Sequence, residues 1–147
     1  MQTPVWFQMN EGALSVPPQW EDKTITALSF PAGSRSPEAS FAITRDPSGN
    51  SAGSLSGYVD RQVADLAKTC RKFSLIDRHA STVDSLPAEV IEFSWQSPDG
   101  MGVVQQQTVL LLSSGTALTF TGTARREKFS TYADMFQQMV GSFQVRK

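Results

Sequence analysis

The residue types that could support chemistry are few, and the first candidates lie on one short segment. Asp77, His79 and Ser81 alternate along a predicted strand and are the residue types of a nucleophilic triad. Side chains two positions apart on a strand stand side by side on one face, so they do not converge on one reacting atom. We therefore interpret His79 as a surface histidine of a strand.

Metal and nucleotide chemistry have little support in the sequence. His79 is the only histidine and Cys70 the only cysteine, so a metal site with two or more histidines is excluded. Cys70 falls on the apolar stripe of a predicted helix, which favours a buried, unreactive thiol. The glycine-rich motifs of dinucleotide and P-loop sites are absent from the sequence. We expect no enzymatic activity, no bound metal and no cofactor.

Glutamine side chains are the remaining candidates, and the first of them is Gln62. It interrupts the apolar stripe of a predicted helix, between Val59 and Leu66. If Gln62 is buried it needs a hydrogen-bond partner, because an unpaired buried amide costs about 1–3 kcal/mol. The alternative is a glutamine at the edge of the stripe that reaches solvent or a strand carbonyl.

Three further glutamines, Gln105, Gln106 and Gln107, follow one another in a predicted strand. Strand alternation places Gln105 and Gln107 on one face and Gln106 on the other. Whichever face is buried, at least one amide then interrupts an apolar surface. Such a surface suits an apolar helix with small or polar residues, because amides donate and accept hydrogen bonds. The alternative is an exposed glutamine ladder on the solvent side of an antiparallel sheet.

The elements that must position these residues are predicted from hydrophobic periodicity and turn residues. The predicted strands are Val5–Gln8, Ala13–Val16, Thr24–Phe30, Ser40–Arg45, Ser74–Val83, Ala88–Gln96, Gly102–Leu112 and Thr116–Arg125.

Two segments have helical spacing of apolar residues. The first runs from Leu55 to Phe73 and can be capped by Ser54 or Ser56. The second follows Ser130 as a candidate cap, with a stripe formed by Tyr132, Met135, Phe136, Met139, Val140 and Phe143. The order of elements predicts an α+β fold, a mostly antiparallel β-sheet covered by two main helices, in a single domain of residues 1–147.

Composition limits the classes of partner. The chain has 147 residues and a net charge of −1, which argues against nucleic acid or an anionic membrane held by charge alone. The longest apolar run, Val109–Leu112, is far too short to anchor the chain in a membrane. The N-terminus lacks the features of a secretory signal. We expect a soluble, cytoplasmic protein.

Six short motifs occur in a shared order along the chain: Met9-Asn10-Glu11-Gly12, Leu14-x-Val16-Pro17, Trp20-x-Asp22-x-Thr24, Ile43-Thr44-Arg45-Asp46, Tyr58-Val59-Asp60-Arg61-Gln62 and Gln105-x-Gln107. Together they resemble the Eag family, the effector-associated chaperones of type VI secretion, whose fold is similar to the PsbP-like proteins. The resemblance implies a PsbP-like α/β sandwich.

The resemblance also implies a function. It implies a cytoplasmic homodimer that binds the N-terminal transmembrane segment of a cognate toxin effector, of Rhs/PAAR type, and shields it before loading and export. The implied client-binding residues are Gln62, Gln105 and Gln107 as polar contacts and Ile25, Ala27, Ile43, Leu66 and Val103 as the apolar lining. The alternative is a non-catalytic PsbP-like subunit that binds a folded protein or a small ligand.

Overall fold

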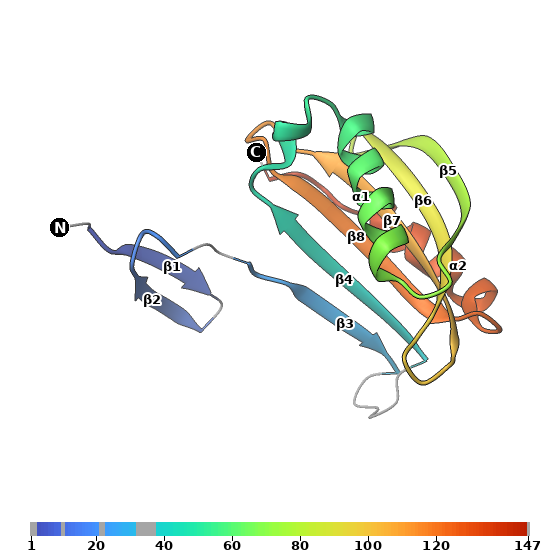
Figure 1. Ribbon diagram of the computed structural model, residues 1–147. Helices are drawn as coiled ribbons and strands as arrows, with labels where there is room; N and C mark the ends of the chain where they lie inside the picture. The colour runs from blue at the N-terminus through green and yellow to red at the C-terminus, as the bar shows by residue number, and fades with distance from the viewer. Residues whose placement is uncertain (1–2, 10, 21–22, 32–37, 147) are drawn as a thin grey trace.

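A six-stranded antiparallel sheet with one helix on each face forms the body of the molecule (Figure 1). The computed structural model describes residues 3–9, 11–20, 23–31 and 38–146. The strand order in the body is β3-β4-β8-β7-β6-β5, and a separate two-stranded sheet pairs β1 with β2. The strands are β1 (Val5–Met9), β2 (Gly12–Val16), β3 (Thr26–Phe30), β4 (Ala39–Asp46), β5 (Ser74–Val83), β6 (Leu86–Gln96), β7 (Gly102–Leu111) and β8 (Ala117–Arg125).

The predicted strands are confirmed, with bounds that differ by at most two residues. The turns between β6 and β7 and between β7 and β8 fall at the predicted breaks. Gly100 and Gly115 there have φ of 86° and 90°, a conformation that glycine adopts at little cost. The motif residues Asn10 and Asp22 lie outside the described residues.

Helix α1 (Leu55–Thr69) follows a short 3-10 turn, Gly49–Ala52, and lies over β6 and β7. Its predicted cap is confirmed, because the Ser54 hydroxyl accepts a hydrogen bond from the Gly57 N–H at 2.9 Å. The helix ends earlier than expected. Cys70 is the C-cap in an extended conformation and is half-buried, so it does not lie within the helix as predicted.

Helix α2 (Phe129–Gly141) lies on the opposite face and packs mainly on β8. The predicted cap is wrong here, because Ser130 is already inside the helix and its N-cap Lys128 makes no side-chain capping bond. The predicted stripe is only partly buried. Phe136 and Val140 enter the core, whereas Met135 and Met139 remain exposed.

Two hydrophobic clusters, one on each side of the sheet, make the core. On the α1 side, Val59 packs with Ile91, Phe93 and Val109. The larger cluster on the α2 side joins β4, β7 and β8 to α2 and includes Phe41, Leu110, Phe120, Tyr132 and Phe136. None of the described helices is both long and apolar enough to cross a bilayer.

Candidate functional site

The glutamines of β7 project to both sides of the sheet, as strand alternation predicts. Gln107 is opposite Ile91, a member of the α1-side cluster. Gln106 lies on the α2 side, together with Leu110. Both Gln106 and Gln107 are buried, so these residues do not form an exposed ladder.

Helix α1 and β7 are joined by a hydrogen bond between two of the predicted site residues. The Gln62 amide donates from Nε2 to Oε1 of Gln107 at 3.3 Å, across a contact that is partly buried. This bond satisfies the polar side chain that interrupts the apolar stripe of α1. Each carboxamide retains donor and acceptor positions that this bond does not use.

The other two glutamines of β7 also have partners. Gln105 donates from Nε2 to the Thr123 hydroxyl on β8 at 3.0 Å. On the opposite side of the sheet, Gln137 of α2 donates to Oε1 of Gln106 at 2.7 Å. The strand therefore bonds through its amides to both helices.

Small residues predominate on the part of the α1 side that α1 leaves open. The register places Gln107 in a row with Thr121 of β8, Ala42 of β4 and Ala27 of β3. The next row joins Gln105 to Thr123 of β8, Ser40 of β4 and Ser29 of β3. We call this surface the small-residue face, and its members are Ala27, Ser29, Ser40, Ala42, Thr44, Thr121 and Thr123. In Figure 1, α1 lies over β6 and β7 and leaves β3 and β4 uncovered.

Most of the predicted site residues share this side of the sheet. Gln105, Gln107 and Val103 alternate along β7, and Ala27 is exposed in the row of Gln107. Leu66 packs partly buried against the α1-side cluster and so holds α1 on the sheet. The structure therefore brings Gln62, Leu66, Val103, Gln105, Gln107 and Ala27 together on one side.

Two predicted residues lie elsewhere. Ile43 is opposite Phe120 on the neighbouring strand and packs against the α2-side core. Ile25 precedes β3 by one residue and is 63% exposed. The sequence could not place Ile43, because its face depends on the register between β4 and β8.

Sequence reasoning overlooked the small-residue face, although a signal was present. Ser40, Ala42 and Thr44 alternate on β4, and Thr119, Thr121 and Thr123 alternate on β8. These alternations mark a face without large side chains. That the two strands are neighbours follows only from the strand order.

The polar residues considered for catalysis do not assemble a reactive centre in the described part of the chain. His79 Nδ1 and Asp77 Oδ2 are hydrogen-bonded at 2.7 Å on the edge strand β5, where both side chains are exposed. Ser81 lies further along the same strand and is also exposed. Among the described residues, no group of three or more His, Cys, Asp or Glu side chains could hold a metal ion.

Two polar networks anchor α1. Arg78 of β5 contacts Glu89 and Asp60 at 2.6 Å each, and these hydrogen bonds raise the pKa of its guanidinium. Tyr58 donates to Asp46 Oδ2 at 3.1 Å. The pKa of Tyr58 is raised to about 12, mainly by burial and next by the charge of Asp46. The position of Gln62 is therefore set by contacts on both sides of the helix.

A sequence profile of the DcrB family matches residues 11–142. The chain is also 31% identical over 90 residues to Effector EagT6 of Pseudomonas aeruginosa, and the match covers 61% of this chain and 62% of that protein. The matched segment thus spans less than two thirds of the length of this curated relative. The predicted resemblance to the Eag family is confirmed by this similarity.

Solved structures show the same fold. A Pseudomonas aeruginosa protein of unknown function, described as a putative regulator, has a TM-score of 0.80 at 23% identity over 99% of both chains. Cyanobacterial PsbP from Synechocystis has a TM-score of 0.56 at 13% identity, over 99% of this chain and 94% of that chain. LpqN of Mycobacterium tuberculosis has a TM-score of 0.57 at 15% identity, over 85% of each chain. The predicted PsbP-like α+β fold is confirmed.

Proposed function

Because the chain belongs to the DcrB family and is similar to Effector EagT6, we propose that it is a non-catalytic chaperone or adaptor of type VI secretion. Its client is the N-terminal transmembrane segment of a cognate toxin effector, which it shields in the cytoplasm as a homodimer before loading and export. A transmembrane segment carries about 20 apolar residues that water drives to aggregate, so it needs a protein surface to cover it.

The observation that carries this proposal is the small-residue face beside the bonded pair Gln62 and Gln107. Adjacent strands lie about 4.8 Å apart, so β8, β4 and β3 present a strip roughly 10 Å wide, close to the diameter of a helix. Along β4 the face runs from Ser40 to Thr44, about 15 Å, which is roughly half the length of a membrane-spanning helix. Small side chains let the client backbone approach closely, as at helix contacts within membranes.

The glutamines supply polar contacts that carry no charge. A client helix with small or polar residues can hydrogen-bond to the amides of Gln62, Gln105 and Gln107, and a neutral amide is less costly to bury than an ion. Val103 and Ala27 contribute apolar contact on the same side. Leu66 acts by holding α1, and Ile25 extends the surface beyond the start of β3, whereas Ile43 supports β4 from the reverse side.

Co-expression tests the proposal directly. The chain is co-expressed with the N-terminal transmembrane-bearing fragment of the toxin effector encoded beside it, and the soluble fraction is purified through a tag on the chain. We expect a soluble complex, because the fragment alone should aggregate. A fragment that remains insoluble in the presence of the chain would overturn the proposal.

Two double variants test on which side of the sheet the client binds. Q62M/Q107M removes the amide pair on the α1 side, and Q106M/Q137M removes the corresponding pair on the α2 side of the same strand. We expect the first variant to bind the fragment roughly tenfold more weakly, which corresponds to the loss of one or two hydrogen bonds. The second should bind within about twofold of the wild type. Equal binding by both variants would remove Gln62 and Gln107 from the client site.

A further inference from the structure

One row of side chains crosses the main sheet beneath α1. The register joins Arg78 of β5 to Ile91 of β6, and Ile91 to Gln107 of β7. Ile91 is buried beneath the helix and packs with Val59. Arg78 and Gln107 are two strands apart, about 10 Å, which is the diameter of a helix. The row therefore forms a cradle for α1, with a cation on one side, an apolar floor, and an amide on the other side.

Helix α1 meets the two sides of this cradle with different flanks. On the β5 side, Arg78 donates from Nη1 to Asp60 Oδ1 at 2.6 Å and from Nη2 to the Ser56 carbonyl oxygen at 3.2 Å. Ser56 and Asp60 are four residues apart and share one flank of the helix. Gln62 lies about 200° around the helix from Asp60, and its amide donates to Gln107 at 3.3 Å. The two polar contacts thus hold opposite flanks of one helix.

The apolar contacts of α1 define its rotation about its own axis only weakly. Of the 15 residues of α1, all of which the structure describes, only Val59 is buried. Burial of apolar surface has no preferred direction. A rotation of about 10° moves the flank of a helix about 10 Å across by about 0.9 Å. The bond between Gln62 and Gln107 is already long, at 3.3 Å, so a shift of this size breaks it.

Arg78 supplies the direction that the apolar contacts lack. Its Nε donates to Glu89 Oε1 of β6 at 2.6 Å, and the Glu89 side chain is only 14% exposed, so the guanidinium is anchored to the sheet. The planar guanidinium holds its donors in a fixed fork. Asp60 is 67% exposed, and a pair with so exposed a member adds little to stability. The contact with Asp60 therefore contributes orientation more than stability.

We propose that Arg78 is a positioning residue of the client site. By holding Ser56 and Asp60 it sets the rotation of α1, and through that rotation it places the amide of Gln62 on Gln107. The inference rests on the client site proposed above and adds to it a residue of the edge strand β5, two strands away from Gln107.

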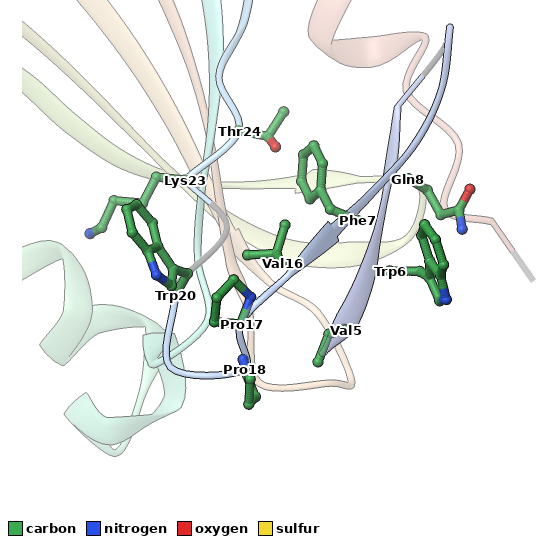
Figure 2. A pocket seen from close by; sticks show the side chains of 10 residues that line it. All are labelled: Val5, Trp6, Phe7, Gln8, Val16, Pro17, Pro18, Trp20, Lys23 and Thr24. Carbon is green, nitrogen blue, oxygen red and sulfur yellow. The ribbon is translucent and has the colours of Figure 1, made fainter. Parts of the chain in front are cut away.

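The N-terminal hairpin offers a control that lies away from the cradle. The hairpin and the corner after β2 form an open cavity of about 670 Å³, and Figure 2 shows Phe7, Val16 and Trp20 around it. The side chains that line this cavity come from residues 5–24, whereas α1 and the cradle come from residues 55–107. The variant W20A changes a side chain that is 72% exposed and leaves the cradle intact.

NMR of the chain without a client tests the positioning by itself. In the wild type we expect nuclear Overhauser effects (NOEs) from the side-chain amide of Gln62 to Gln107 and from Val59 to Ile91. R78M and D60A should lose the first NOE and keep the second, because the helix turns but stays on its apolar floor. General loosening of α1 would remove both NOEs, so this pattern separates positioning from a merely structural role.

Three further variants should retain both NOEs. D60N keeps an acceptor oxygen for Arg78, R71M removes the same charge at an exposed position after α1, and W20A alters only the hairpin. An NOE from Gln62 to Gln107 that persists in folded R78M would overturn the inference, as would the loss of both NOEs together. If R78M does not fold, D60A decides in the same way, since its changed side chain is exposed.

Binding of the effector fragment connects this position to the client. We expect D60A to bind the fragment roughly threefold more weakly and D60N within about twofold of the wild type, because only D60A loses the acceptor. In a Q62M background D60A should cause no further loss, since its effect passes through Gln62. An equal loss in both backgrounds would overturn the inference. A fragment that does not bind even the wild type would overturn the proposed client, and the NOEs would still judge the role of Arg78.

Discussion

Single residues hold α1 in place through hydrogen bonds between distant parts of the chain. Tyr58, in the first turn of α1, donates to Asp46 at the end of β4. Asp46 also accepts from the Ser48 hydroxyl at 2.9 Å, and this bond is the main cause of the lowered pKa of its carboxyl group. The network fixes the N-terminal end of the helix that carries Gln62.

The phenol of Tyr58 should therefore stay protonated until the pH approaches its pKa of about 12. A folded-state pKa above the unfolded value of about 10 means that the stabilisation is complete below pH 10 and is lost as the pH rises through 12. Absorbance titration of Y132F, in which Tyr58 is the only tyrosine, measures this pKa. Y58F should lose about 1 kcal/mol of stability at pH 8 and show a weaker decline between pH 10 and 12. A Tyr58 midpoint near 10 would contradict the arrangement.

At the scale of elements, the close packing of α2 on the sheet depends on one glycine of β8. A Cβ atom on Gly122 would lie only 2.4 Å from the Phe136 ring. Phe136 cannot yield easily, since its ring is also packed against Phe41 and Phe129, at centroid distances of 6.2 and 6.0 Å. The distance between α2 and β8 is thus set by the absence of a side chain.

We expect Gly122→Ala to lower the free energy of unfolding by about 1–3 kcal/mol, as overpacked core positions do. Gly141→Ala is the matched control, because nothing lies within 4 Å of a Cβ atom at that end of α2. The control should be neutral or slightly stabilising, since alanine favours helix. Urea unfolding of both variants measures the difference, and equal midpoints would show that α2 does not approach β8 this closely.

At the scale of the whole molecule, the core and the apolar residues of the β1–β2 hairpin belong to different parts of the chain. Every member of the two core clusters lies between residues 39 and 143, whereas Val5, Trp6, Leu14 and Trp20 are exposed near the N-terminus. Folding of the body and coverage of the hairpin are therefore separate requirements. The first is met within one chain.

A variant that lacks residues 1–24 should therefore keep the body folded. We expect cooperative urea unfolding and the circular dichroism expected of the six-stranded sheet with its two helices, because both clusters remain complete. Loss of cooperative unfolding would show that the hairpin contributes to the core of its own body.

Local patterns in the sequence were sufficient for the elements and for part of the site. Alternation with period two predicted the strands and placed Gln105 and Gln107 opposite in direction to Gln106, because the pleat of one strand determines these directions. The cap at Ser54 was predicted for the same local reason. The cap at Ser130 was wrong, since a serine within the first turn of a helix gives the same local signal.

Relations between strands decided the rest. The sequence could not show that Ile43 faces α2 while Gln62 and Gln107 face the opposite side, because that depends on the register of β4 with β8. The small-residue face exists only because β8, β4 and β3 are neighbours. Nor could periodicity show that Met135 and Met139 stay exposed, since burial requires another surface within reach. Strand order, register and the position of the hairpin are non-local, and they arise only when the packed chain brings distant segments together.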